Sequence, residues 1–321
     1  MGRTSTGAGR GHARGEARMS IDAVIDIGTN STKILVADGG RDILRALEVT
    51  RLGEGLATGG RLSPAAIDRT VAAVSALAAR ARDAGATGIT VVGTAACRRA
   101  VNTADLAAAV RDACGLDLTV LTGEQEASLS FTGALRRLPR IAGNTLVVDI
   151  GGGSTELCVG VDEPHRAVSI PVGAVTATET DLTTDPPRPE DLTNVIGAVQ
   201  DELEEIGRLH PEMLTASRVV GIAGTIVTVA AVEIGQAVLD EQALHGFMLT
   251  REAAEDVFRT LATEPLADRV RNPGLPRERA DIIVAGCCVL VGLMRRLQLD
   301  EITVSTGSLR DGVIERGRLL P

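Results

Sequence analysis

An internal duplication constrains the fold of this 321-residue chain more than any other feature of its sequence. Segment 24–36 (VIDIGTNSTKILV) recurs as segment 147–159 (VVDIGGGSTELCV) at one constant offset. Each copy has the pattern of an apolar strand, a turn of glycine and small hydroxyl residues, and a second apolar strand. The duplication predicts two similar lobes, and the cleft between two such lobes is a common place for a small ligand.

The two turns have the composition of phosphate-binding loops. Gly28 in the first copy and 151–153 in the second are expected to adopt conformations that other residues resist and to let amides approach a ligand closely. Successive amides of this kind form an anion-binding nest, to which Ser31, Ser154 and the following threonines add hydroxyl donors. The alternative interpretation is a pair of glycine-rich hairpin turns that bind nothing.

An aspartate stands at the end of the first strand in each copy, at Asp26 and Asp149. A carboxylate beside a bound phosphate is repulsive unless a cation lies between them. Magnesium binds through one or two carboxylates together with phosphate oxygens, so the pattern predicts a magnesium ion between these carboxylates and the bound phosphate.

Composition excludes several other classes of protein. Aromatic residues make up 1% of the chain and the net charge is −9, which argues against a general nucleic-acid binder. Five cysteines without C-x-x-C spacing indicate a reduced, cytoplasmic protein, and four scattered histidines argue against zinc. The longest apolar run, 282–294, is shorter than the roughly 20 residues of a spanning helix, so we expect no association with a membrane.

Strand and helix patterns alternate along both halves, which predicts an α/β protein. Residues 1–19 are expected to form a disordered N-terminal extension. The strands expected outside the hairpins are 88–94, 118–121, 167–172, 218–222 and 301–304. The expected helices are 63–85, 103–113, 124–135, 190–209, 251–262 and 280–297.

Six ordered motifs resemble those of the exopolyphosphatase/guanosine pentaphosphate phosphatase (Ppx/GppA) family of the actin and sugar-kinase superfamily, over residues 22 to 316. They are DIGTNS at 26–31, GTAACRRAVN at 93–102, GEQEA at 123–127, DIGGGSTE at 149–156, GIAGT at 221–225 and LRDG at 309–312. The resemblance implies two similar actin-like (ribonuclease H-like) domains with a cleft between them. We expect these domains at 20–134 and 135–321, with the last helix a candidate to return to the first domain.

The resemblance also implies magnesium-dependent hydrolysis of the terminal phosphoanhydride of inorganic polyphosphate, releasing orthophosphate. Glu126 matches the family's catalytic base, although Gln125 replaces the preceding acid and Ser128 replaces the usual basic residue. The sequence without the resemblance also allows a structural interpretation of Glu126, as an acidic residue in the first turn of a helix that the helix dipole stabilises. Arg98 is the second expected catalytic residue, neutralising phosphate charge. The expected phosphate-binding residues are Gly28, Thr29, Asn30, Ser31, Gly151, Gly152, Gly153, Ser154 and Thr155, and the expected metal ligands are Asp149, Glu156 and Asp26.

Several alternatives remain open at the level of sequence. The same machinery would serve a guanosine pentaphosphate 5′-phosphohydrolase, a non-catalytic sensor of nucleotides or alarmones would bind without turnover, and the GIAGT segment also suits a sugar or acetate kinase. Lys33 is the single lysine of the chain, and it either contacts phosphate or has been retained by chance. The resemblance makes a homodimer the expected assembly.

Overall fold

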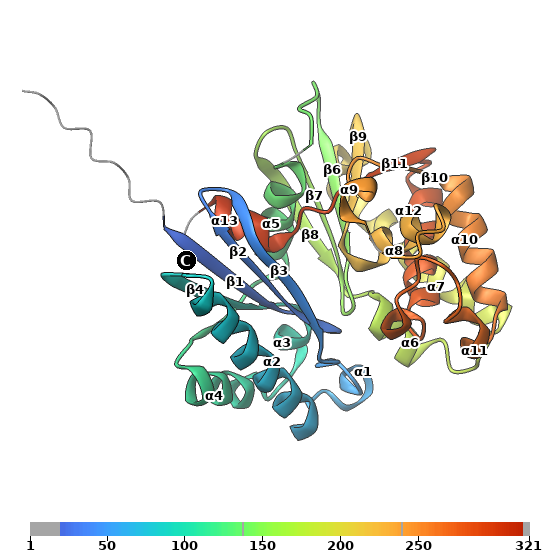
Figure 1. Cartoon of the computed structure of the whole chain (residues 1–321). Helices are drawn as coiled ribbons and strands as arrows, with labels where there is room; N and C mark the ends of the chain where they lie inside the picture. Colours follow the sequence, from blue (N-terminus) through green and yellow to red (C-terminus); the bar gives the residue numbers. More distant parts are fainter. Residues whose placement is uncertain (1–19, 137, 239, 317–321) are drawn as a thin grey trace, which may run out of the picture.

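A computed structural model describes residues 20–136, 138–238 and 240–316. Two mixed β-sheets, each with its own set of helices, form two lobes that lie side by side (Figure 1). The expected α/β class is therefore confirmed, while the domain boundary at 134/135 stays a prediction. The expectation for residues 1–19 falls outside the described residues.

The first lobe contains a five-stranded sheet in the order β3-β2-β1-β4-β5. β2 pairs antiparallel with both β1 and β3, whereas β4 pairs parallel with β1 and β5. The strands are β1 (Ile21–Ile27), β2 (Ser31–Asp38), β3 (Arg41–Val49), β4 (Gly88–Gly93) and β5 (Leu118–Val120).

The second lobe repeats this order as β8-β7-β6-β9-β11 and adds the antiparallel edge strand β10 beside β11. The sequence duplication is thus a duplication of the whole sheet topology. The strands are β6 (Thr145–Ile150), β7 (Thr155–Gly160), β8 (Pro164–Ile170), β9 (Arg218–Ile222), β10 (Met248–Thr250) and β11 (Glu301–Val304).

The helices begin and end largely where turn and capping residues predict. Ser63 accepts a hydrogen bond from the amide of Ala66 at the start of α2, with a proline at its first position, and Thr122 and Gln125 form a capping box at the start of α5. In the first half they are α1 (Leu56–Gly59), α2 (Pro64–Asp83), α3 (Ala95–Arg99), α4 (Thr103–Cys114) and α5 (Gly123–Leu135). In the second half they are α6 (Ala174–Thr180), α7 (Pro189–Leu209), η1 (Pro211–Leu214), α8 (Ala223–Glu233), α9 (Glu241–Leu244), α10 (Arg251–Thr263), α11 (Leu266–Arg269), η2 (Arg277–Arg279), α12 (Ile283–Arg296) and α13 (Leu309–Glu315).

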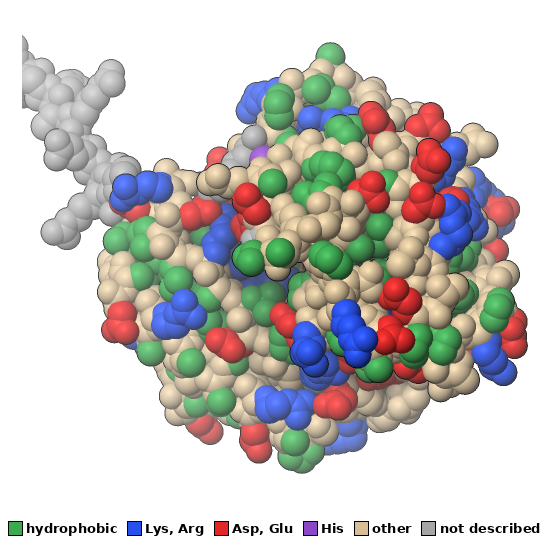
Figure 2. Space-filling model, turned by 45° about the vertical axis from the view of Figure 1, so that its right-hand side comes forward, with side chains coloured by type: hydrophobic (Ala, Val, Ile, Leu, Met, Phe, Trp, Pro, Cys, Tyr) green, Lys and Arg blue, Asp and Glu red, His purple; other side chains and the backbone are tan. Residues whose placement is uncertain are grey.

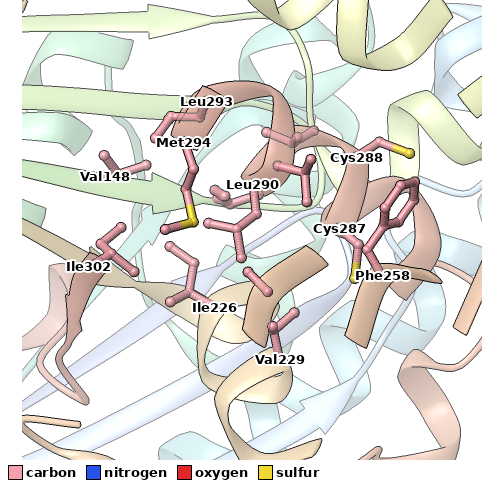
Figure 3. Packing of buried hydrophobic residues seen from close by; sticks show 14 of the residues in the cluster. Val148, Ile226, Val229, Phe258, Cys287, Cys288, Leu290, Leu293, Met294 and Ile302 are labelled. Atoms are coloured by element: carbon pink, nitrogen blue, oxygen red, sulfur yellow. The ribbon is translucent and has the colours of Figure 1, made fainter. Parts of the chain in front are cut away.

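The largest core lies in the second lobe around α12, which is buried over most of its length. Leu290 and Met294 of this helix pack with Ile226 of α8 and Ile302 of β11 (Figure 3). Its cysteines belong to the same cluster, and the five cysteines of the chain are free. As the long apolar run predicted, α12 is a core helix, and no helix in the described part of the chain is long and apolar enough to cross a membrane.

Two helices connect the lobes. α5 packs on β7 and β8 of the second sheet, whereas α13, the red helix at the end of the chain in Figure 1, packs on α5 and on β1 and β2 of the first sheet. Leu309 and Val313 of α13 share a buried cluster with Val24 and Val92 of the first sheet. The last helix therefore lies between the first sheet and α5, and its first residues reach the site described next.

Charged side chains of both signs are interspersed over the face drawn in Figure 2. Elsewhere in the chain, ion pairs join exposed partners, such as Arg111 with Asp117 and Arg69 with Glu54. This distribution is typical of a solvated surface and leaves the chemically informative charges to the interior of the cleft.

Candidate active site

A cavity of about 90 Å³ lies where the two hairpin turns face each other. Its wall is completed by the segments that precede α3 and open α5, α8 and α13, so both lobes contribute. The lining includes the predicted residues Asp26, Gly28, Thr29, Asn30, Ser31, Glu126, Asp149, Gly151, Gly152, Gly153 and Ser154. Three further predicted residues, Arg98, Thr155 and Glu156, lie behind that lining.

The two turns have the same backbone geometry. The amide of Gly28 donates to the carbonyl of Ser31 at 3.1 Å, and the amide of Gly151 donates to the carbonyl of Ser154 at 3.0 Å. In each case an added Cβ would lie 3.0 Å from the carbonyl oxygen, which is tighter than ordinary contact. The turns therefore require glycine at their first position because the chain folds back closely there.

One expectation about these glycines is wrong. No glycine from 151 to 153, nor Gly28, has a left-handed backbone, so the alternating conformation that defines an anion nest is not what they provide. Gly152 and Gly153 are required because there is no room for a side chain at either position. A Cβ at Gly152 would lie 3.2 Å from Cβ of Thr29, and one at Gly153 would lie 2.9 Å from Ala95. The glycines let the two turns approach each other across the cleft.

Strand register places a different pair of charges at each hairpin. Asp26 lies opposite Lys33 in the first hairpin, and Asp149 lies opposite Glu156 in the second. Because directly opposed residues share one face of a sheet, the first pair is self-neutralising and the second is a pair of carboxylates. Burial raises the pKa of Asp26 and of Asp149 and lowers that of Lys33. The two carboxylates of the second hairpin repel each other, so this hairpin needs a bound cation more than the first does.

Hydroxyl groups hold the two carboxylates of the second hairpin. Ser130 of α5 donates to Oδ2 of Asp149 at 2.7 Å. Oε1 of Glu156 accepts from Ser154 at 2.6 Å and from Ser169 at 2.7 Å. Burial, reinforced by the neighbouring Asp149, raises the pKa of Glu156 to about 7. These hydrogen bonds fix both carboxylates in orientation.

Glu126 lies in the first turn of α5 and is 8% exposed. Burial, followed by the repulsion of Glu156, raises its pKa well above the ordinary value for a glutamate. Arg98 forms an ion pair with Glu126 and a longer one of 3.3 Å with Glu156, and it donates to the carbonyl of Leu121. Arg98 thus bridges the acid of α5 and the acid of the second hairpin.

The cations that line the cavity are mostly residues to which the sequence assigned no role. Lys33, Arg279 and Arg310 line it, and burial lowers the pKa of each. Arg279 lies so close to Gly224 that a Cβ there would overlap its guanidinium group. Arg310 stands inside the LRDG motif, which was a signal of its importance, whereas Arg279 is brought into place only by the fold. These groups supply the positive potential for an anionic ligand.

Several buried polar atoms around the cavity have no hydrogen-bond partner among the residues that the structure describes. They are Oδ1 of Asp26, Nδ2 of Asn30, Oε2 of Glu156 and Nε of Arg310. Buried polar atoms are normally paired, so each of these is a candidate contact for a ligand. The two carboxylate oxygens suit a cation, while the amide and the guanidinium suit an anion.

In the described ranges, no three side chains of the His, Cys, Asp or Glu type lie close enough to enclose a metal ion. A zinc site, which needs three or four such ligands, does not fit. The residues of the cavity do fit a hard cation that binds one or two carboxylates and completes its coordination shell with water and phosphate oxygens. Magnesium coordinates in this way.

A second chamber of about 290 Å³ opens from the first past Lys33, Arg279 and Arg310. Apolar side chains from β3 and α8, including Leu47, Val49 and Val227, line much of it. Two acids, Glu241 and Glu278, stand at its walls. The chambers differ in character, because polar and apolar surface are about equally represented in the first, whereas apolar surface predominates in the second.

Comparison with known proteins was consistent over nearly the whole chain. Residues 34–319 match the Ppx/GppA phosphatase family. The chain is 33% identical over 308 residues to exopolyphosphatase 2 of Mycobacterium tuberculosis, covering 91% of this chain and 96% of that protein. It is 29% identical over 296 residues to the guanosine-5′-triphosphate,3′-diphosphate pyrophosphatase of Vibrio atlanticus, covering 91% of this chain and 58% of that longer protein. The crystal structure of the Aquifex aeolicus member of the Ppx/GppA family superposes with a TM-score of 0.77 at 30% identity, over 92% of this chain and 96% of that one.

Proposed function

The chain belongs to the Ppx/GppA phosphatase family and is a phosphoanhydride hydrolase, and from this premise we propose that it is an exopolyphosphatase. The observation that carries the proposal is a buried acid, Glu126, facing a polar cavity whose wall also holds Lys33, Arg279 and Arg310. A linear chain of phosphates is the ligand that needs several cations in succession and one base at its end.

Glu126 acts as the base in the proposed reaction. Its carboxylate orients a water molecule for in-line attack on the terminal phosphorus and accepts the proton of that water. A raised pKa makes the carboxylate a stronger acceptor, and Arg98 holds it in place through their ion pair. The displaced phosphate chain is the leaving group, so no covalent intermediate with the protein is required.

The two turns hold the terminal phosphate. Residues 29–31 and 152–154 line the cavity from opposite lobes, so their amides and the hydroxyl group of Ser31 would donate to the phosphate, and Nδ2 of Asn30 adds a donor without another partner. Donors fixed before the substrate arrives stabilise charge that develops in the transition state. Lys33, Arg279 and Arg310 would neutralise the following phosphates of the chain.

Asp149 and Glu156 would hold a magnesium ion, directly or through water, and Asp26 would contact it only through water. When bound, the ion would neutralise the phosphate oxygens that otherwise repel these carboxylates. The partnerless oxygens of Asp26 and Glu156 support this assignment. Ser130, Ser169 and Arg98 hold the carboxylates in position.

Guanosine pentaphosphate is the second candidate substrate, because the apolar chamber beside the phosphate site favours it. A phosphate chain makes no apolar contact with Leu47, Val49 and Val227, whereas a nucleoside would bury its base and ribose against them. The acids Glu241 and Glu278 would accept hydrogen bonds from N1–H and the exocyclic amino group of a guanine. Cleavage at the 5′ end would then use the same base and the same metal.

A comparison of initial rates distinguishes these substrates. Phosphate release is measured with magnesium on short polyphosphate, long polyphosphate and guanosine pentaphosphate at matched concentrations of terminal phosphate. We expect kcat/KM to be highest for a polyphosphate. A higher value for the nucleotide would move the assignment to the guanosine pentaphosphatase, and binding without release of phosphate from any of them would indicate a sensor.

A cytoplasmic location and a homodimeric assembly are part of the same proposal. The five free cysteines support a reducing compartment. Sedimentation equilibrium of the purified protein would test the dimer.

A further inference from the structure

Ser130 stands out because it is a buried hydroxyl that contacts the proposed metal site from a different element. It is 1% exposed and donates its hydrogen bond to Oδ2 of Asp149 at 2.7 Å. Asp149 belongs to β6, whereas Ser130 belongs to α5. The bond therefore fixes the carboxylate of the hairpin to a helix that packs against its sheet.

The same helix carries the proposed base. Glu126 and Ser130 are four residues apart, so they lie on one face of α5 about one turn from each other. Both side chains point to the second hairpin, where Glu126 is tied through Arg98 to Glu156 and Ser130 is tied to Asp149. The base and the two carboxylates thus form one connected unit.

The first hairpin has an equivalent aspartate but, among the described residues, no serine equivalent to Ser130. Asp26, the counterpart of Asp149, faces Lys33 and retains Oδ1 as a buried atom without a partner. The structure gives it no hydroxyl anchor of the kind that Ser130 provides. The duplicated aspartates have therefore diverged, and only the second is held in a fixed orientation from outside its hairpin.

We propose that Ser130 is a positioning residue that orients Asp149 toward the cation and so keeps the cation at a fixed position relative to Glu126. This inference rests on the proposed function, since it takes Asp149 as a metal ligand. Because the hydroxyl binds Oδ2, we assign the other oxygen, Oδ1, to the cation. Hydrogen-bond partners of metal ligands typically contribute about 10- to 100-fold to metal affinity or activity.

Ser130→Ala removes the hydroxyl while leaving the helix and its packing intact. Manganese serves as a paramagnetic substitute for magnesium, and its dissociation constant is measured by electron paramagnetic resonance in the presence of inorganic phosphate. We expect Ser130→Ala to raise this constant about 10-fold. The magnesium concentration for half-maximal polyphosphate hydrolysis should rise in parallel, while kcat at saturating magnesium recovers.

Two further variants make the outcome decisive. Thr132→Ala is the matched control, because Thr132 lies on the same helix and donates only to the carbonyl of Ser128. It should leave manganese binding unchanged. Asp149→Asn tests the ligand itself and should lose binding more severely than Ser130→Ala.

The results separate this inference from the proposed function. If Ser130→Ala binds manganese as the wild type does while Asp149→Asn does not, Ser130 has no positioning role and the ligand assignment stands. If neither variant alters binding, Asp149 is not a ligand, and both the assignment and the role of Ser130 fall. Equal losses in Ser130→Ala and Thr132→Ala would also overturn the proposal, because they would reflect a general effect on α5.

Discussion

The crossing of α5 and α13 depends on glycine, and Gly133→Ala tests how tightly it is packed. A Cβ at Gly133 would lie 2.8 Å from the carbonyl carbon of Ser308 and 2.9 Å from the amide nitrogen of Gly312, where ordinary contact begins at 3.4 Å. These atoms belong to the backbone of α13 and its N-terminal segment, so no side chain can rotate away. The helix must move as a body.

The cost of that movement follows from what α13 buries. Helix propensity alone would favour alanine by about 1 kcal/mol. Overpacking typically costs about 1–3 kcal/mol, and displacing α13 also exposes part of Leu309 and Val313, each worth roughly 1.5–3 kcal/mol when fully buried. We therefore expect a net loss of about 2–3 kcal/mol, or roughly 3–5 °C in the unfolding midpoint of a chain of this length.

Gly197→Ala is the matched control, since Gly197 lies inside α7 with open space around the position of a Cβ. There the same substitution should stabilise the protein by about 0.5–1 kcal/mol. Differential scanning calorimetry of the three proteins checks both signs. A midpoint for Gly133→Ala at or above that of the wild type would refute the packing argument.

Two further predictions concern the charges of the site. Burial raises the pKa of Glu156 from 4.5 to about 7, so the metal-free protein holds stability below pH 4.5 that it loses as the pH rises through 7. Its melting temperature should fall between pH 5.5 and pH 8, less so in Glu156→Gln, and magnesium should restore it at pH 8; a flat profile would contradict this. Arg279→Ala should raise KM for polyphosphate about 10-fold, whereas the exposed neighbour Arg277 should tolerate alanine, and equal KM values in both variants would remove Arg279 from the phosphate path.

Local patterns predicted much of the fold. The strands 218–222 and 301–304 have the expected bounds, and the long helices were located to within a few residues because caps and apolar periodicity mark them. β3 and α13 were not expected. β3 is an edge strand with several half-exposed positions, and α13 is short, so neither has a strong periodic signal.

The site was predictable where it is duplicated and hidden where it depends on tertiary contact. Asp26, Asp149 and the two turns line the cavity as expected, because the repeat places them at equivalent positions of two similar sheets. Arg279 reaches the cavity only through the packing of its guanidinium on Gly224, and Ser130 acts across from a helix to a strand. Sequence spacing contains no information about either contact.

The most direct test of the proposed function measures phosphate release from polyphosphate by the wild type and by Glu126→Gln, with magnesium present. Glu124→Gln is the control, because Glu124 lies in the same first turn of α5 but is exposed and does not line the cavity. We predict release by the wild type and by Glu124→Gln, and a loss of at least about 100-fold in kcat for Glu126→Gln with polyphosphate still bound. Undiminished release by Glu126→Gln would contradict the role of this residue as the base, and no release by the wild type would contradict the exopolyphosphatase itself.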